Sequence, residues 1–312
     1  MTDKVLGADL GGTSIKWGIV DRDGNAVHED RVPLPDRKSD TVAGLLRDIV
    51  REGFSRTKGK LSGIGIGSPG LIDREGRIVR VSPNFPEWKD VPLADLVREA
   101  AGDTPVLLEN DANLLVYSET RWGAAKGMTD IVCLTLGTGV GGGVMTGGIV
   151  LRGAGGGAAE LGHVPLTPDG PLCGCGNLGC LEAYCNIEAT MRTAQEVYFP
   201  ETSPEDPAGL SEAAETGDEL AREVWRRIGG WLGLAVGGFV NMFNPQVVLI
   251  GGGLSGAGEW LLAPAREVAA ERAYTPNWEQ TELKLAGLRH RSGLLGAAAL
   301  AFTAAEGRRE SR

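Results

Sequence analysis

Three cysteines and one histidine lie close together in the segment 160–182, ELGHVPLTPDGPLCGCGNLGCLE. The candidate metal ligands are His163, Cys173, Cys175 and Cys180. Three thiolates and one imidazole form the closed tetrahedral set that a structural zinc prefers. A lone buried cysteine would indicate only a small apolar side chain, but three within eight residues, preceded by a histidine, match the ligand patterns of zinc sites. The sequence therefore predicts a structural Zn²⁺ site, with a cluster of plain buried cysteines as the alternative.

Two glutamates frame this cluster. Glu160 precedes His163 by three residues, so on a helical turn both side chains face the same way. Glu182 follows Cys180 by two residues. A zinc with four protein ligands has no open position for catalysis, so its expected role is to fix the loop that presents Glu160, His163 and Glu182 to a polyhydroxy ligand. The alternative for both glutamates is solvated surface charge.

Glycine-rich turns join two pairs of predicted strands. Residues 11–13 follow the apolar run 5–9, and residues 137–143 follow the run 131–136. The tip of such a hairpin can approach an anion through backbone N–H groups. The first turn is neither a P-loop nor a dinucleotide fingerprint, because no GK[ST] ends it and a strand follows where a helix should. Two matching hairpins indicate internal duplication, with both turns closing on one phosphate chain; a simple mobile hairpin tip is the alternative.

Other polar or flexible residues lie at the ends of predicted strands. Asp111 ends one strand and opens a helix, the position where open α/β sheets bind ligands; a helix cap is the alternative. Asn84 lies in the loop SPNFPEWKD, where it either reaches a ligand or serves the turn. Glycines 251–253 end a later strand and are placed to lie against an adenine or ribose.

The composition restricts the class of protein. The 312 residues are enough for two domains with a sizeable core. A formal net charge of −10 argues against a nucleic-acid or membrane surface. Five cysteines, three of them assigned to a metal, fit a reducing compartment. We therefore expect a cytoplasmic protein without a nucleic-acid or membrane partner.

These motifs together resemble the ROK family (repressors, open reading frames, kinases), and within it the bacterial glucokinases, over nearly the whole chain. LGADLGGTSIK resembles the first phosphate motif of the family and LTLGTGVGGGV the second. ENDAN resembles the segment of the catalytic aspartate, and ELGHVPL with GPLCGCGNLGCLEAY resembles the sugar and zinc signature. The chain departs from the family at Ala159, where glycine is usual, and near Cys185, where serine is common. Neither touches a proposed catalytic atom, so we expect neither to matter.

The resemblance implies an α/β fold of two actin-like (ribonuclease H-like) domains with an interdomain cleft. We expect an N-terminal domain over residues 1–114, onto which a C-terminal helix over 295–312 packs back. A larger domain over 115–294 would carry the zinc-binding insertion. The implied activity is that of an ATP-dependent hexose kinase, a glucokinase that makes glucose 6-phosphate. Its expected cofactors are ATP, Mg²⁺ and structural Zn²⁺, its ligand is glucose or a related hexose, and its expected state is a homodimer or homotetramer.

The resemblance also implies a role for each matching residue. Asp111 would be the catalytic base. The sugar hydroxyls would be held by Asn84, Asn110, Asp111, Glu160, His163 and Glu182. The ATP-binding residues would be Asp9, Gly11, Gly12, Thr13, Lys16, Gly137, Thr138, Gly139, Gly141, Gly252 and Gly253. A side chain at Gly139 would obstruct the approach of a phosphate to the backbone.

Other functions stay open at this point. The same polar set can hold N-acetylglucosamine, N-acetylmannosamine or fructose in place of glucose. A non-catalytic sugar sensor of the family would be expected to lose Asp111 or a glycine turn, and both are intact. A repressor of the family needs a DNA-binding domain ahead of the first strand, whereas four residues precede Val5 here. The acidic charge also disfavours that function.

Overall fold

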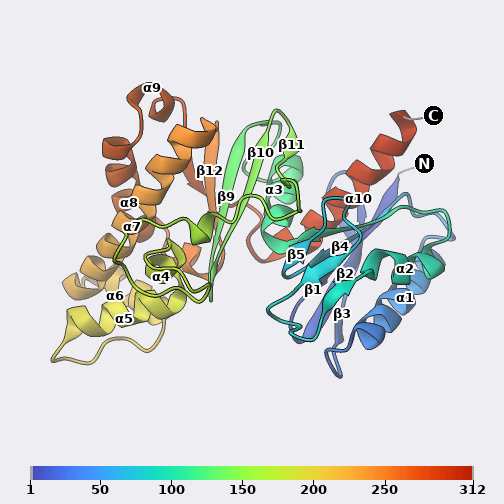
Figure 1. Ribbon diagram of the computed structural model, residues 1–312, viewed down its shortest axis with the longest axis horizontal. Helices are drawn as coiled ribbons and strands as arrows, with labels where there is room; N and C mark the ends of the chain where they lie inside the picture. Colours follow the sequence, from blue (N-terminus) through green and yellow to red (C-terminus); the bar gives the residue numbers. More distant parts are fainter. Residues whose placement is uncertain (1–2, 311–312) are drawn as a thin grey trace. The chain divides into compact units, whose positions relative to one another are not determined.

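The computed structural model describes residues 3–310, with side chains as far as residue 306 (Figure 1). The chain divides into two compact units. Unit 1 consists of the residues up to Gly127, Leu151–Ala158 and the residues from His290 onward, and unit 2 consists of Met128–Val150 and Ala159–Arg289. The boundary expected at residue 114 lies inside helix α3 (Asp111–Trp122), all of which belongs to unit 1.

Unit 1 is built on a five-stranded sheet with the order β3-β2-β1-β4-β8. Strands β1 to β3 form an antiparallel meander, whereas β4 and β8 continue the sheet parallel to β1. The strands are β1 (Lys4–Leu10), β2 (Ser14–Asp21), β3 (Ala26–Pro33), β4 (Ile64–Ser68) and β8 (Val106–Asn110). A second, three-stranded sheet consists of β5 (Leu71–Ile72), β6 (Val79–Val81) and β7 (Lys89–Val91). The helices are α1 (Ser39–Arg56), α2 (Leu93–Ala101), α3 and α10 (Ser292–Glu310), the last preceded by the 3-10 turn η3 (Arg289–Arg291).

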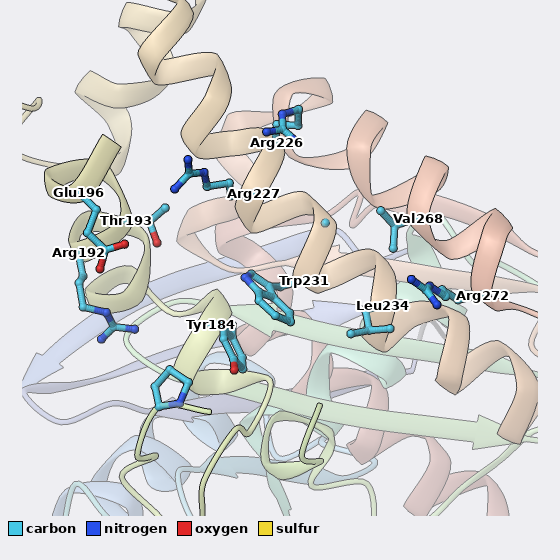
Figure 2. Close-up of a pocket in the computed structure, with 12 residues that line it drawn as sticks. Tyr184, Arg192, Thr193, Glu196, Arg226, Arg227, Trp231, Leu234, Val268 and Arg272 are labelled. Carbon is cyan, nitrogen blue, oxygen red and sulfur yellow. The ribbon is translucent and has the colours of Figure 1, made fainter. Parts of the chain in front are cut away.

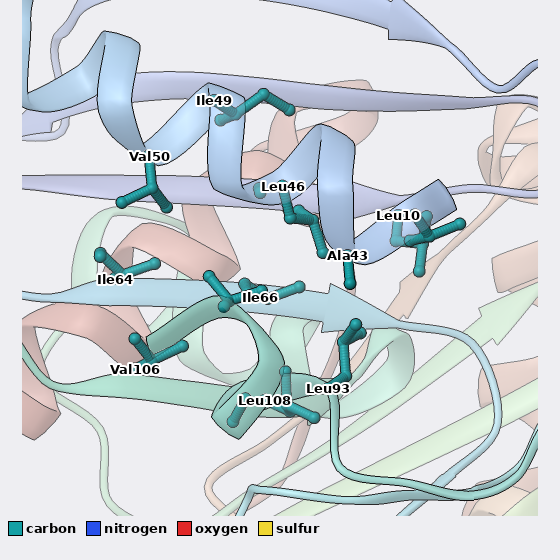
Figure 3. Packing of buried hydrophobic residues seen from close by; sticks show 14 of the residues in the cluster. Leu10, Ala43, Leu46, Ile49, Val50, Ile64, Ile66, Leu93, Val106 and Leu108 are labelled. Carbon is teal, nitrogen blue, oxygen red and sulfur yellow. The ribbon is translucent and has the colours of Figure 1, made fainter. Parts of the chain in front are cut away.

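One face of this sheet packs against α1 (Figure 3). Helix α1 places apolar residues three or four positions apart, the spacing that gives a helix one buried stripe. Each side chain of Leu or Ile size that is fully buried stabilises the fold by about 1.5–3 kcal/mol. The buried residues labelled in Figure 3 are Leu10, Ala43, Leu46, Ile49, Val50, Ile64, Ile66, Leu93, Val106 and Leu108.

The opposite face of the sheet carries Gly7 on β1 and Gly65 and Gly67 on β4, where glycine alternates with isoleucine. A Cβ at Gly7 would lie 2.7 Å from the carbonyl oxygen of Leu294, and a Cβ at Gly65 would overlap the carbonyl oxygen of Ala297. The backbone of α10 therefore contacts the strands directly. Figure 1 shows this helix, in red, beside the blue and cyan strands of unit 1.

Unit 2 repeats the architecture of the first sheet. Its strand order is β11-β10-β9-β12-β13, again with an antiparallel meander on one side and two parallel strands on the other. The strands are β9 (Ile131–Leu136), β10 (Val140–Thr146), β11 (Ile149–Val150), β12 (Val247–Gly251) and β13 (Glu282–Leu285). The repeated order agrees with the internal duplication that the two glycine hairpins indicate.

Helices α7 and α8 form the closest helix pair of unit 2. Glycines at 229, 233 and 237, four residues apart, lie on one side of α7, where an added Cβ would meet the backbone or side chains of α8. The sequence predicts one or two helices here, and the structure shows one continuous helix. The helices of unit 2 are α4 (Glu182–Cys185), α5 (Ile187–Tyr198), α6 (Pro207–Glu215), α7 (Glu219–Phe243), α8 (Glu259–Arg272) and α9 (Thr275–Trp278), with 3-10 turns η1 (Leu161–His163) and η2 (Gly253–Ala257).

One local prediction is wrong at its end. The proline-rich stretch 200–209 is predicted as a surface loop, but α6 already begins at Pro207. Proline suits the first position of a helix, because the N–H that it lacks has no partner there. Asp206 caps the helix by accepting a hydrogen bond from the N–H of Gly209 at 2.8 Å. In the described part of the chain, every helix is too short or too polar to cross a membrane.

Candidate functional site

The four candidate metal ligands converge in unit 2. One donor atom from each lies within 4.8 Å of the others. The Sγ atoms of Cys175 and Cys180 are 3.8 Å apart, and Nδ1 of His163 is 3.6 Å from Sγ of Cys173. Two thiolates that share a tetrahedral zinc with bonds of about 2.3 Å lie about 3.8 Å apart. The donor set and its spacing are consistent with zinc.

Tight backbone turns hold the cysteines in place. The N–H of Cys173 donates to the carbonyl of Asn177 at 2.8 Å, and the N–H of Gly176 donates back to the carbonyl of Cys173 at 2.9 Å. Gly176 has a φ of 93°, which side chains disfavour. Gly179 has a φ of 69°, and a Cβ there would overlap the carbonyl oxygen of Thr167. Gly176 and Gly179 are therefore required by the turns.

Glu160 and His163 belong to one 3-10 turn. Glu160 stands at the start of η1, and its carbonyl accepts a hydrogen bond from the N–H of His163 at 3.0 Å. Side chains three residues apart in such a turn lie on the same side. Among residues 3–310, neither the exposed carboxylate of Glu160 nor Nε2 of His163 has a hydrogen-bond partner in the protein. Both groups are therefore available to a ligand.

Glu182 joins the cysteine loop to the second glycine turn. Its Oε2 accepts a hydrogen bond from the N–H of Val140 at 2.9 Å, and its Oε1 accepts one from Sγ of Cys173 at 3.3 Å. Val140 directly follows the turn 137–139, so the carboxylate of Glu182 lies beside that turn. A Cβ at Gly139 would lie 2.7 Å from Oε2. Glu182 thus already has protein partners, in contrast to Glu160.

Ala159, where the family usually has glycine, adopts the backbone conformation of a glycine. Its φ is 63°, in the left-handed region that L-residues with a Cβ avoid. The expectation that this departure does not matter concerned catalytic atoms. The structure adds a conformational cost, because alanine has a Cβ and yet holds this positive φ. The cost falls next to the site, since Ala159 immediately precedes Glu160.

Replacing Ala159 by Gly should raise the free energy of unfolding by about 0.5–1 kcal/mol, because it relieves the left-handed strain. The matched control is Ala158→Gly, because Ala158 has a negative φ and the change there should lower stability by about 0.5–1 kcal/mol. Chemical denaturation of both variants would measure the effect. Equal destabilisation by both changes would contradict this account.

A third glycine segment lies beside the second glycine turn. Gly252 has a φ of 84°, and a Cβ there would overlap the backbone of Leu136 at the end of β9. Residues 252–253 therefore lie next to the turn 137–139. A cavity of about 410 Å³ extends from Gly253 along α6, a volume in the range of small-molecule sites.

Asp111 opens helix α3 in unit 1. The N–H of Ala112 donates to Oδ1 of Asn110 at 2.8 Å and to Oδ1 of Asp111 at 3.0 Å. Nδ2 of Asn110 donates to the carbonyl of Gly70 at 2.9 Å, which fixes the cap. The side chain of Asp111 is accessible to water, yet protein surrounds much of it. This desolvation raises the pKa of Asp111 above the usual 3.8, although the N–H of Ala112 acts in the opposite direction.

Asp9 lies at the end of β1, near Asp111. Burial raises the pKa of Asp9, Lys16 opposite it on β2 lowers it, and the carboxylate of Asp111 raises it again. The adjoining glycine turn is closed by a hydrogen bond from the N–H of Gly11 to the carbonyl of Ser14 at 3.0 Å. These residues bring two carboxylates and one ammonium group to the same edge of unit 1.

Asn84 lies against the first glycine turn. A Cβ at Gly12 would lie 3.4 Å from Nδ2 of Asn84, so the amide group stands beside the turn. The backbone carbonyl of Asn84 accepts a hydrogen bond from Arg37 at 3.2 Å. The loop that carries Asn84 is therefore held near the turn, as a loop that presents a ligand-binding side chain requires.

A buried polar network behind Asp111 could not be found from the sequence. The buried carboxylate of Glu109 accepts hydrogen bonds from the N–H of Asn110 and from Nδ2 of Asn113, both at 3.1 Å, and forms an ion pair with Arg152 at 2.7 Å. Arg152 also donates to the hydroxyl of Tyr117 at 2.9 Å, and burial raises the pKa of Tyr117 to about 12. The network fixes the backbone that presents Asn110 and Asp111. The only signal in the sequence is the charged Glu109 in an otherwise apolar strand, and this signal does not identify the residues that pair with it.

Two sheets of the same order, each with a glycine turn between its first two strands, define the actin-like class of ATPase folds. The chain belongs to the ROK family, whose model matches residues 5–304. The expected fold class and the expected family are both confirmed.

Relatives and solved structures align over nearly the whole chain. A glucokinase of Thermotoga maritima is 41% identical over 309 residues, which cover 95% of this chain and 96% of the relative. The structure of a ROK hexokinase from Thermus thermophilus has a TM-score of 0.83 and 36% identity, covering 97% of this chain and 99% of its own. The structure of a ROK glucokinase from Streptomyces griseus, solved with glucose and AMPPNP, has a TM-score of 0.77 and 34% identity, covering 96% of this chain and 99% of its own.

Proposed function

We propose that this protein is an ATP-dependent hexose kinase that phosphorylates glucose to glucose 6-phosphate. The observation that carries the proposal is the placement of Asp111: a carboxylate at a strand end and helix start, with a raised pKa, in a ROK-family chain. A general base works best when its pKa approaches the working pH, because proton transfer then gains driving force. Asp111 would accept the proton of the sugar 6-hydroxyl as that oxygen attacks the γ-phosphoryl group.

The sugar would be oriented by polar side chains. Glu160 and Nε2 of His163 are available for its hydroxyls, and the side chains of Asn84 and Asn110 would add contacts. Glu182 would accept a hydrogen bond from a further sugar hydroxyl, because its carboxylate has lone pairs that its present partners do not use. Catalysis of such a reaction depends mainly on positioning and on charge neutralisation, because its transition state is loose, so these side chains would contribute by fixing one hydroxyl in line with the phosphate.

The phosphates of ATP would lie on backbone N–H groups of the glycine turns at 11–13 and 137–139, with Lys16, Thr138 and Gly141 beside them. The turn at 252–253 would lie against the adenine or ribose, in line with the adjoining cavity. Mg²⁺, when bound, supplies charge neutralisation on the phosphates, and one or two carboxylates are the protein ligands that it usually takes. Asp9 fits that need, because it lies near the proposed base and close to the first glycine turn.

Zinc would have a structural role. All four donors come from the protein, so the set is closed. Through Nδ1 of His163, and through the turn that leads from Cys180 to Glu182, the cluster would hold two sugar-binding side chains in place.

A substrate panel with purified protein, ATP and Mg²⁺ tests the proposed function. Glucose should be phosphorylated with a higher kcat/KM than N-acetylglucosamine, N-acetylmannosamine or fructose. A preference for one of those sugars would keep the kinase but replace its substrate. Sugar binding without any turnover would contradict the proposal in favour of a sugar sensor.

Glycine substitutions separate the ATP site from the sugar site. Gly137→Val has open space for its side chain, so it should raise the KM for ATP and leave the KM for sugar within about twofold. Gly139→Val should raise both constants, because its side chain would displace the carboxylate of Glu182. An effect on the sugar site is therefore expected at Gly139 in addition to the obstruction of the phosphate. Steady-state kinetics with each substrate varied would decide, and unchanged constants in both variants would contradict a phosphate site at this turn.

A homodimeric or homotetrameric state and a cytoplasmic location belong to the same proposal. Phe199 exposes a large apolar side chain in unit 2, 83% accessible, which a contact between subunits would cover. Sedimentation velocity would give the mass of the particle, and a monomer would contradict the expected assembly.

A further inference from the structure

A separate cavity in unit 2 takes no part in the proposed reaction. It has a volume of about 570 Å³ and lies between helices α5, α7 and α8, above the loop that carries the cysteines (Figure 2). Small-molecule sites usually have volumes of about 300–1,000 Å³. The side chains that give the cavity its character are Tyr184, Arg192, Arg226, Arg227, Trp231 and Arg272.

Four guanidinium groups line this cavity in a chain whose net charge is −10. Arg226 and Arg227 share a single carboxylate, that of Glu223, at 2.5 and 2.7 Å. Arg192 donates to the backbone carbonyl of Ala183 at 3.0 Å, so its charge is not neutralised there. Two carboxylates lie nearby: Glu223, which pairs with Arg226 and Arg227, and Glu196, which lines the cavity. The four guanidinium groups therefore leave an excess of two positive charges.

Arg272 strengthens the case for an anionic ligand. Within residues 3–310, its guanidinium group has no hydrogen-bond or ion-pair partner, although it lines the cavity. Figure 2 shows Arg192 and Arg227 near Glu196, whereas Arg272 lies farther along, beyond Leu234. Guanidinium groups bind phosphate oxygens in a fixed, often bidentate geometry. The cavity can therefore receive negative charge at both ends.

An aromatic surface lies between these charged ends. The rings of Tyr184 and Trp231 stack with their centroids 4.0 Å apart and their planes 24° apart. The hydroxyl of Tyr184 is hydrogen-bonded to that of Thr167 at 2.6 Å, which fixes the ring. Leu234 and Val268 add apolar surface. Such a surface suits the flat or apolar face of a ring, because stacking adds to simple burial.

A second copy of the chain is a less suitable occupant. Subunits related by a two-fold axis contact one another through the same surface patch. That arrangement would bring the guanidinium groups of one copy toward those of the other, and like charges at a contact are unfavourable.

We propose that this cavity binds a small organic phosphate that carries a ring. Its phosphate would pair with Arg192 and Arg227, and its ring would lie on Trp231. A sugar phosphate and a nucleoside monophosphate share this chemistry, and the experiment distinguishes them.

Hydrogen exchange measured by mass spectrometry would locate the ligand. The protein is incubated with glucose 6-phosphate or with AMP, without ATP and without Mg²⁺, so turnover plays no part. We expect at least one of them to slow exchange in peptides that cover 184–193 and 226–234. The compound that does so identifies the source of the phosphate. Failure of both to protect these peptides would overturn the proposal, whatever the kinase assay shows.

Calorimetry on matched variants tests the chemistry of binding. Arg192→Gln combined with Arg227→Gln should weaken binding of the protecting compound at least about tenfold. Arg51→Gln combined with Arg98→Gln removes the same charge from the exposed surface of unit 1 and should change little. Trp231→Leu should weaken binding of the protecting compound about three- to tenfold. It should leave the binding of inorganic pyrophosphate unchanged, because pyrophosphate has no ring to stack on the indole.

Two results would contradict this site. One is equal binding by the double cavity variant and its control, because the arginines would then not contact the ligand. The other is absence of binding together with a change in sedimentation mass in the double cavity variant. That outcome would identify the cavity as a contact between copies of the chain.

Discussion

Replacing Asp111 by Asn should abolish sugar phosphorylation while sugar affinity stays within about tenfold of the wild type. Asparagine has nearly the same size and can still accept the hydrogen bond from the N–H of Ala112. It cannot accept the proton of the attacking hydroxyl, and loss of a general base typically costs 10²–10⁴ in rate. A coupled assay of kcat and calorimetry of sugar binding would separate the two effects.

A matched change controls for the loss of one carboxylate. Asp48→Asn alters an exposed residue of α1 whose partner is Arg51, and it should leave kcat unchanged. Turnover near the wild-type value in Asp111→Asn would show that another group accepts the proton. A loss of sugar binding much greater than tenfold would instead place the main role of Asp111 in the ground state.

The pH dependence gives an independent test of the same assignment. Desolvation raises the pKa of Asp111 above 3.8, and only the deprotonated carboxylate can act as a base. The value of kcat/KM should therefore fall as the pH decreases, with a midpoint above 3.8. The residual activity of Asp111→Asn should lack this decrease. If the decrease persists in the variant, it belongs to another group.

Local patterns predicted the parts of the site that are close in sequence. The cysteines and His163 converge because short glycine turns connect the cysteines and a short loop brings the histidine to them. The strand–turn–strand units at 11–13 and 137–139 follow from apolar runs on either side of glycine. In each case the spacing of a few residues fixes the geometry, so no long-range information is needed.

Contacts between distant segments could not be predicted in this way. Arg152 pairs with Glu109 from 43 residues away, and Glu182 reaches the N–H of Val140 from 42 residues away. Each depends on how separate strands and loops pack, and many surface arginines and glutamates carry the same local signal. The left-handed conformation of Ala159 was hidden for a related reason, since alanine usually marks ordinary backbone.

Cys175→Ser should lower thermal stability and sugar affinity together. Cys175 is exposed, so the change removes little packing, but it removes one of four donors. A metal present at about 1,000 times its Kd stabilises the folded state by about 4 kcal/mol, and a weakened site loses much of that. The freed loop also carries His163 and leads into Glu182, two residues after Cys180, so we expect a 10–100-fold rise in the KM for sugar.

Leu172→Ser is the matched control, because Leu172 lies in the same loop, is 71% exposed and is not a donor. It should keep one equivalent of zinc per chain by elemental analysis and a thiolate absorption band after cobalt substitution.

The ATP affinity should change little in either variant, because the proposed phosphate contacts are backbone N–H groups outside the loop. Chelation of the wild type should reproduce the losses of Cys175→Ser, and readdition of zinc should reverse them only in the wild type. Absence of metal from protein purified without chelators, or unchanged stability and sugar KM in Cys175→Ser, would mean that the loop is held by its hydrogen bonds alone.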